Sequence, residues 1–357
     1  MNWLRLHITN LCNFDCPGCH VFKLSKNSVA ETNMHLETAE SSILFFIELL
    51  KKYKLEGGRD FYISIYGGEP LLNRQVLYSI IKKFGKEYEN IKINWIVNTN
   101  GSLLSEEDLL IFKLAEVDIH ISLDGLEESH NKKRVDKLQR GTFKRVVRAI
   151  DLIRKNNYPW LQIDTVFNHQ NKDSIYQTFQ LAQEKGIKRI HNDFFYSSSV
   201  KENFDYEDYA VGYAKTYLEG EKRGLSIFAS PFSQILRNIT YNFQAKSVVS
   251  RFPSLEVFAD KSFTFGELPL VKPFGKINQL SQGRIWFDRS QRLLKFEKEL
   301  AKDCFDCPLD LFCFGEMKRI YRYHTLTNKG EEKICQIARK AIEFLQSNNF
   351  KSAPHVR

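Results

Sequence analysis

The first 196 residues alternate between two hydrophobic patterns. Short, mostly apolar runs predict β-strands at 3–9, 61–68, 92–101, 117–125, 160–168 and 187–196. Apolar residues that recur every three to four positions predict helices at 38–54, 74–88, 105–116, 142–157 and 174–186. Ser105, with Asp108 three residues later, is typical of a helix start. Strands that alternate with helices predict an α/β fold with a parallel sheet, either an open barrel or a doubly wound sheet.

Polar sequences follow the predicted strands where each strand ends. A loop with three cysteines follows the first strand, YGGEP (66–70) ends the second, NTNG (98–101) the third and SLDG (122–125) the fourth. Taken singly, each of these short sequences could equally be an ordinary turn after a strand. Because the carboxyl ends of parallel strands meet at one edge of the sheet, their shared placement predicts a common site there.

The pattern is less regular after residue 200. Residues 201–300 are rich in aromatic side chains, and a final helix is predicted at 331–347. We therefore expect three parts: a core at 1–200, a bridging region that contacts substrate at 201–300, and a small cysteine-containing domain at 301–357.

Composition excludes some classes of protein and leaves others open. The chain has 357 residues, 43% of them apolar, and a formal net charge of +9. This charge indicates either a solvated basic surface or a preference for an acidic peptide or nucleic acid. No nucleic-acid-binding signature occurs, so nucleic acid is not an expected partner. The sequence has no signal-peptide pattern at its start, and its longest apolar stretch (41–50) is about half a membrane span, so we expect a cytoplasmic protein without a membrane partner.

The seven cysteines fall into two groups, with none between Cys19 and Cys304. The first group is Cys12, Cys16 and Cys19, and the second is Cys304, Cys307, Cys313 and Cys335. In a cytoplasmic chain, grouped cysteines indicate metal or redox chemistry rather than disulfides. Structural zinc and a four-iron cubane each need four ligands, so three thiols on one loop leave a position open for another molecule.

Cys12-x3-Cys16-x2-Cys19 after the first strand, with GGEP after the second, resembles the radical S-adenosylmethionine (radical SAM) enzymes. The resemblance implies a partial (β/α)6 TIM-like barrel over residues 1–200 and a [4Fe–4S] cluster on the three cysteines. It also implies that the open iron binds the amino and carboxylate groups of S-adenosylmethionine. One electron from the cluster then cleaves this cofactor to methionine and a 5′-deoxyadenosyl radical, which takes a hydrogen atom from the substrate.

The resemblance also implies roles for residues that match the family pattern. The methionine amino group is assigned to Gly67, Gly68 and Glu69, its carboxylate to Ser122 and Arg134, and the ribose to Asn98 and Asn100. From their residue types alone, Ser122 and Arg134 are also compatible with a strand-end serine and a surface arginine, and the asparagines with turns. Gly18 stands where the family often has an aromatic residue, which leaves the adenine contact to another group, such as His20 or Phe22.

The second cysteine group resembles the C-terminal auxiliary-cluster domain called SPASM. The family motif continues to a further cysteine where this chain has Met317, and upstream cysteines are missing from 201–300. The resemblance therefore implies a truncated domain with one auxiliary [4Fe–4S] cluster on Cys304, Cys307, Cys313 and Cys335. Zinc, or no metal, is the alternative for this spacing. A cluster with four thiolates suits electron transfer or a structural role.

Enzymes with such a tail modify ribosomally made peptides or proteins by cross-linking, epimerisation or oxidation. The resemblance thus implies an oxidoreductase-type maturase whose partners are a precursor peptide or protein and an external electron donor of the flavodoxin or ferredoxin type. The alternatives are a radical SAM dehydrogenase of a small alcohol or sugar, and a zinc-binding scaffold without chemistry. Tyr66, His191, Asp193 and Glu316 are candidate acids or bases, but structural roles explain each of them as well, so no catalytic residue is assigned.

Overall fold

The computed structural model describes residues 3–17, 19, 33–52, 61–167, 174–194, 206–228, 255–265, 275–276 and 331–348. The chain divides into two compact units. Unit 1 comprises Met1–Asp164, Glu184–Ile187 and Phe252–Ser281, and unit 2 comprises Thr165–Gln183, Lys188–Arg251 and Gln282–Arg357. The three-part division at residues 200 and 300 remains a prediction.

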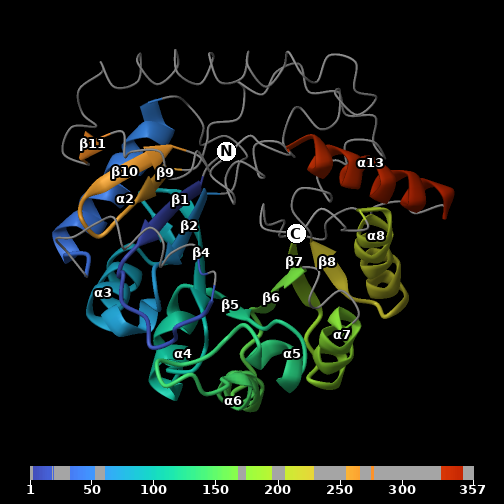
Figure 1. Ribbon diagram of the computed structural model, residues 1–357. Coiled ribbons are helices and arrows are strands. Elements are labelled where there is room, and N and C mark those ends of the chain that lie inside the picture. Colours follow the sequence, from blue (N-terminus) through green and yellow to red (C-terminus); the bar gives the residue numbers. More distant parts are fainter. Residues whose placement is uncertain are drawn as a thin grey trace. The chain divides into compact units, whose positions relative to one another are not determined.

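Unit 1 is built on the predicted parallel sheet (Figure 1). Its parallel strands, in spatial order, are β1 (Trp3–His7), β2 (Phe61–Tyr66), β4 (Ile91–Thr99), β5 (Asp118–Ser122) and β6 (Leu161–Phe167), the last as far as Asp164. Each of the first four strands is paired in parallel with the next in this order. Parallel neighbours need crossover connections, which is why a helix follows each strand in the sequence.

Helices cover one face of this sheet. They are α2 (Leu36–Lys52), α3 (Arg74–Phe84), α4 (Glu106–Leu114) and α6 (Phe143–Lys155), with the short 3-10 helix η1 (Pro70–Asn73) and the one-turn helix α5 (Glu127–Asn131) between them. Figure 1 shows α3, α4 and α6 on the outer side of β2, β4 and β5. The strand residues that face these helices, such as Leu6, Ile63 and Ile121, are completely buried. Their burial supplies the hydrophobic stabilisation of unit 1.

The other face of the sheet carries polar side chains. Successive residues of a strand point to opposite faces, so the residues that alternate with the buried aliphatic ones lie together on this second face. They include Arg5, Ser64, Asn98, His120 and Asp164. The parallel register places these polar side chains next to one another across the strands. The motifs follow the carboxyl-terminal ends of the same strands.

The structure confirms most predicted elements of unit 1 to within a few residues, and one helix ends clearly earlier than predicted. Helix α4 begins after Ser105, whose side chain accepts from the backbone of Asp108 while Asp108 caps Ser105 in return. The helix predicted at 74–88 ends at Phe84, because Gly85 adopts a positive φ of 58°. Beyond it, β3 (Glu87–Tyr88) pairs antiparallel with the start of β4. A positive φ favours glycine and stops a helix, so Gly85 was the signal for this boundary.

The sheet also gains strands from the region predicted to bridge the two cysteine groups. Strand β9 (Leu255–Val257) lies parallel to β1, β10 (Ser262–Phe265) pairs antiparallel with β9, and β11 (Gly275–Lys276) pairs with β10. Strands of two to four residues are too short for a hydrophobic period, so the sequence did not predict them. Part of this region therefore belongs to the sheet itself.

Unit 2 contains α7 (Ile175–Glu184, apart from its last residue), β7 (Arg189–Phe194), α8 (Tyr206–Lys222), β8 (Ser226–Phe228) and α13 (Glu331–Ser347). Strands β7 and β8 are parallel, and α8 packs against α13. The helix predicted at 331–347 is confirmed, with Ile337, Ala341 and Leu345 buried along one face. In the part of the chain that the structure describes, no helix combines the length and apolar character needed to cross a membrane.

Candidate cofactor site

The three-cysteine loop follows β1 and is fixed by backbone contacts. The amide N–H of Asp15 donates to the carbonyl of Val135 at 2.9 Å, and that of Cys19 donates to the carbonyl of Cys16 at 3.2 Å. Cys12, Cys16 and Cys19 are free thiols, and all three are half-buried. The fold thus presents three thiols on one short, anchored loop.

Burial is the largest influence on the pKa values of Cys12 and Cys16. It raises the pKa of Cys12 to about 12, against the lowering effect of the Phe14 amide, while Glu69 and the other two cysteines raise it further. Burial also raises the pKa of Cys16, and the positive charge of Arg134 opposes that shift. Without a cation, Cys12 and Cys16 therefore stay protonated at neutral pH. Binding an iron cluster would ionise them and release protons.

The residues of this loop fit a [4Fe–4S] cluster by their chemistry. Three thiols on one loop match a cluster that keeps one iron open, and N–H groups directed at sulfur are typical of cluster sites. The amide of Phe14 donates to the sulfur of Cys12 at 3.4 Å, and the backbone of Val135 donates to Cys16. Within the described residues, no three potential metal-ligating side chains already converge at a common point.

The glycine motif after β2 packs directly on the cysteine loop. Gly68 donates its amide to the carbonyl of Thr9 at 2.8 Å, and Glu69 donates to that of Leu11 at 2.8 Å. A Cβ atom on Gly68 would lie 2.1 Å from the Leu11 carbonyl oxygen, and one on Gly67 would lie 2.4 Å from that of Thr9. Because Gly67 and Gly68 have no side chain, the two loops can pack against each other this closely. The predicted approach of these glycines to S-adenosylmethionine stays a prediction.

Glu69 is fully buried and already has several donors. Its Oε1 accepts from the Leu71 amide at 3.1 Å and the Thr99 hydroxyl at 2.7 Å, and its Oε2 accepts from the Asn100 amide at 2.8 Å. Burial raises the pKa of this carboxyl, and the three hydrogen bonds counteract the rise. Glu69 therefore ties the end of β2 to the end of β4. Its predicted role as acceptor for an ammonium group remains a prediction.

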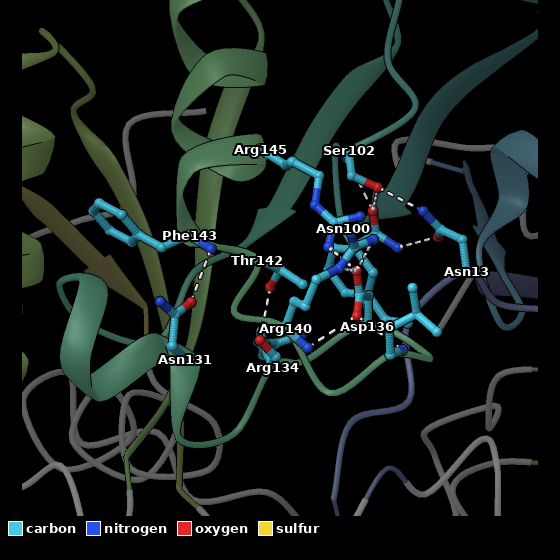
Figure 2. A network of polar contacts seen from close by, with 12 residues as sticks. Asn13, Asn100, Ser102, Asn131, Arg134, Asp136, Arg140, Thr142, Phe143 and Arg145 are labelled. Carbon is cyan, nitrogen blue, oxygen red and sulfur yellow. Dashed lines mark hydrogen bonds and ion pairs between the residues drawn. The ribbon is translucent and has the colours of Figure 1, made fainter.

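The two asparagines predicted for the ribose have different surroundings. Asn98 lies within β4 and donates to the Ser64 hydroxyl at 3.1 Å and, at 3.4 Å, to the carbonyl of Ile65. Asn100 lies beyond the strand end, against the cysteine loop, where its amide nitrogen is 2.9 Å from Asn13 Oδ1 (Figure 2). The same nitrogen is 3.9 Å from the sulfur of Cys12. The ribose contacts of both asparagines stay predictions.

Arg134 is bound to Asp124, a residue that the sequence analysis did not single out. Its Nε donates to Asp124 Oδ2 at 2.7 Å, and its charge interacts with Cys16 and Cys19. Ser122 ends β5 and pairs in register with Asp164. Asp124 follows Ser122 in SLDG, so the motif itself was the signal for it. The assignment of Ser122 and Arg134 to a carboxylate remains a prediction.

A second group that the sequence did not reveal clamps the cysteine loop. Phe14 forms an isolated β-bridge with Asp136, and the Arg145 guanidinium lies 5.3 Å from the centre of the Phe14 ring. Asp136 accepts from Arg145 at 2.8 Å and from Arg140 at 2.9 Å, as Figure 2 shows. These residues are more than a hundred positions from Phe14, so only the fold brings them to it.

Several predicted residues lie outside the described part of the chain. They are Cys304, Cys307, Cys313, Gly18, His20, Phe22, Glu316 and Met317, together with the side chain of Asp193. Cys335 is half-buried on α13. The auxiliary cluster and the adenine contact therefore stay predictions. Tyr66 ends β2 beside His7, with ring centres 5.7 Å apart, and His191 lies on β7 in unit 2.

His120 lies on the polar face of β5 between two carboxylates, Asp164 at 3.4 Å and Asp118 at 3.5 Å, with the Gln162 amide at 3.1 Å. Burial by itself would lower the pKa of His120, but the two carboxylates outweigh it and raise the pKa from 6.5 to about 9. Its stabilising contribution is therefore complete below pH 6.5 and is lost as the pH rises through about 9. The difference between the two pKa values corresponds to about 3 kcal/mol.

We expect the free energy of unfolding of the native protein, minus that of a His120→Gln variant, to fall by about 3 kcal/mol between pH 6 and pH 10. Urea unfolding at several pH values measures this difference. Glutamine keeps polar groups between the carboxylates but cannot take up a proton in this range. A difference that stays constant with pH would contradict the assigned charge of His120.

Residues 6–182 match the sequence model of the radical SAM superfamily. This match covers the end of β1, the cysteine loop, the glycine motif and the strands β2 to β6. Residues 6–182 form a radical SAM domain. The predicted fold class is confirmed as well, an α/β fold with a parallel sheet that forms an unclosed barrel, as in solved radical SAM enzymes.

Curated relatives match this chain at low identity. The chain is 26% identical over 193 residues to the uncharacterized protein MJ0907 of Methanocaldococcus jannaschii, a match over 54% of this chain and 62% of that protein. It is 20% identical to the radical SAM cyclopropyl synthase TigE of Paramaledivibacter caminithermalis, over 98% of this chain and 75% of TigE. A cysteine-type anaerobic sulfatase-maturating enzyme of Clostridium novyi is 27% identical over 47% of this chain and 45% of its own length. The matched part is thus less than two thirds of two of these three relatives.

A solved structure shares the fold over nearly the whole chain. It is native anSMEcpe with bound S-adenosylmethionine and the Cp18Cys peptide, with a TM-score of 0.73 at 20% identity. The match covers 97% of this chain and 96% of that one. At this identity the likeness is evidence of a shared fold alone.

Proposed function

We propose that this protein is a radical SAM maturase that acts on a ribosomally made peptide or protein. The observation that carries the proposal is the docking of the Gly67–Glu69 motif on the loop of Cys12, Cys16 and Cys19. This contact brings the predicted cofactor-binding motif and the predicted cluster ligands to one place. Support for a peptide substrate comes from the peptide bound to anSMEcpe and from the sulfatase-maturating enzyme among the relatives.

In this proposal the three cysteines hold a [4Fe–4S] cluster, and the residues that hold S-adenosylmethionine are Gly67, Gly68, Glu69, Asn98, Asn100, Ser122 and Arg134. The bound cofactors supply one-electron cleavage of S-adenosylmethionine and a carbon-centred radical that takes a hydrogen atom from the substrate. The protein's part is to orient these groups and to exclude water. Glu69 fixes the ends of β2 and β4, and Arg134 contributes a positive charge near Cys16 and Cys19.

We further propose that Cys304, Cys307, Cys313 and Cys335 hold one auxiliary [4Fe–4S] cluster in a truncated SPASM-type domain at 301–357. A cluster with four thiolates has no open iron, so its role would be to pass electrons or to stabilise the domain. Electrons would reach the enzyme from an external flavodoxin- or ferredoxin-type donor. Residues 201–300, which contribute β9 beside β1 and β10 beside β9, would contact the substrate.

The first test is a count of iron and sulfide per chain after anaerobic reconstitution. We expect about eight irons in the native protein and about four in a Cys12→Ala/Cys16→Ala/Cys19→Ala variant, since each cubane holds four. The native protein should also release 5′-deoxyadenosine from S-adenosylmethionine under reducing conditions, and the variant should not. If the native protein held about four irons together with zinc, the second cysteine group would be a zinc site and not an auxiliary cluster. No iron in the native protein would overturn the proposed function.

A further inference from the structure

Asn100 holds one amide N–H toward the sulfur of Cys12. The Asn100 side chain is largely buried, and its Nδ2 lies 3.9 Å from Cys12 Sγ and 2.9 Å from Asn13 Oδ1. A primary amide has two N–H groups, so one can serve Asn13 while the other is directed at the sulfur. The distance of 3.9 Å is long but lies within the range of an N–H···S contact.

The orientation of this amide is fixed by its oxygen. Asn100 Oδ1 accepts from the Ser102 backbone N–H at 2.9 Å and from the Ser102 hydroxyl at 2.7 Å (Figure 2). A backbone N–H can only donate, so the oxygen must face Ser102 and the nitrogen must face Cys12. Asn13 adds a further contact, since its own amide donates to the Ser102 hydroxyl at 2.8 Å.

The backbone of Asn100 is held equally firmly. Its N–H donates to the buried Glu69 carboxylate at 2.8 Å, so the residue is fixed to the end of β2. The side chain is therefore oriented in advance of any cluster binding. Among the described residues it provides the one side-chain hydrogen bond to a cysteine sulfur of the loop, whereas the donors from Phe14 and Val135 belong to the backbone.

We infer that Asn100 tunes the reduction potential of the cluster on Cys12, Cys16 and Cys19 and positions the Cys12 ligand. The inference rests on the proposed function, because it requires that cluster. Hydrogen bonds to cluster sulfurs and thiolates stabilise the reduced form, which carries more negative charge, and so raise the potential. Asn100 is thus a positioning residue that acts through Cys12. The Asn100 side chain already contacts Asn13, Ser102 and Cys12, so the inferred role does not depend on a contact with ribose.

The test compares reduction potentials of the reconstituted full-length protein. Native protein, Asn100→Ala, the isosteric Asn100→Asp and the control Asn94→Ala are poised at a series of potentials with dithionite and mediators. The reduced cluster is counted by electron paramagnetic resonance. The cluster with the open iron is identified as the one whose signal changes when S-adenosylmethionine is added. Asn94 is a suitable control because it is a part-buried asparagine on β4, the strand that ends just before Asn100, but its amide donates to the Phe61 carbonyl, away from the cysteines.

We expect the ratio of reduced to oxidised cluster at a fixed potential to fall about tenfold in Asn100→Ala, a shift of about 59 mV to more negative potential for a one-electron couple. Asn100→Asp should shift further in the same direction, because it adds a negative charge. Asn94→Ala should match the native protein. A purely structural role would lower the iron content without moving the potential of the clusters that remain.

A milder variant keeps the inference testable if both Asn100 variants fail to retain iron. Ser102→Ala removes one of the two hydrogen bonds that orient the amide, and we expect a smaller shift in the same direction. A native potential in iron-replete Asn100→Ala, or in Ser102→Ala when the Asn100 variants hold no iron, would overturn the inference and leave the proposed function standing. No iron in the native protein would overturn the proposed function and the inference with it.

Discussion

A Gly68→Ala substitution should destabilise unit 1 by about 3 kcal/mol or more. The new Cβ would lie 2.1 Å from the carbonyl oxygen and 2.4 Å from the carbonyl carbon of Leu11. Both of these are backbone atoms, so no side-chain rotation can relieve the overlap. The cysteine loop would have to move away, and the hydrogen bonds from Gly68 to Thr9 and from Glu69 to Leu11 would be lost with it.

Urea unfolding measures this loss, and the iron content after reconstitution reports the displacement of Cys12. Gly85→Ala is the matched control, since Gly85 has a positive φ of 58° but open space around it, with the nearest atom 3.9 Å from the position that a Cβ would take. Because φ 58° with ψ −158° is a conformation that essentially only glycine adopts, that change should cost about 1–3 kcal/mol through backbone strain alone and leave the iron content unchanged. If Gly68→Ala were no more harmful than Gly85→Ala, the close packing of the two loops would be refuted.

An Asp108→Ala substitution should lower the free energy of unfolding by about 3–5 kcal/mol. Asp108 has a fully buried carboxylate that accepts from Arg74 Nε at 2.8 Å and Nη2 at 2.9 Å, and from the Tyr78 hydroxyl. It also accepts from the backbone and hydroxyl of Ser105 and so completes the cap of α4. Removing the carboxylate takes the charge partner from Arg74 and loosens the contact between α3 and α4.

Urea unfolding at pH 7 checks this expectation, with Ser105→Ala as the control. Ser105→Ala removes only the cap and should cost about 1 kcal/mol. Burial favours the neutral form of Asp108, but Arg74, Tyr78 and Ser105 outweigh it and hold the pKa of Asp108 below its ordinary value of 3.8. Its contribution is therefore complete above pH 3.8 and is lost as the pH falls through the lower folded pKa. If the two variants lost the same free energy of unfolding, the ion pair between Arg74 and Asp108 would contribute nothing to stability.

Local sequence predicted the radical SAM domain well where a signal was long or chemically specific. Helix α4 was identified because Ser105 and Asp108 are only three residues apart, and the strands of the sheet were identified from their apolar runs. The helix predicted at 74–88 extended too far, because its apolar pattern continues past Gly85 while the backbone does not. The strands β9 and β10 were missed, because three or four residues give no period to recognise.

The sequence by itself determined the alternation of the longer strands and helices up to residue 196, the three-thiol loop and the placement of the glycine motif at the end of β2. These features depend on neighbours in the chain, so their periods and spacings can be seen in the letters. Only the tertiary structure decided which side chains meet around the loop and the sheet: Asn100 with Cys12, Arg145 with Phe14, and Glu256 with His7. Such contacts join residues up to 249 positions apart and depend on strand register and the paths of the loops. No local pattern encodes them, because each is fixed only once the sheet has formed.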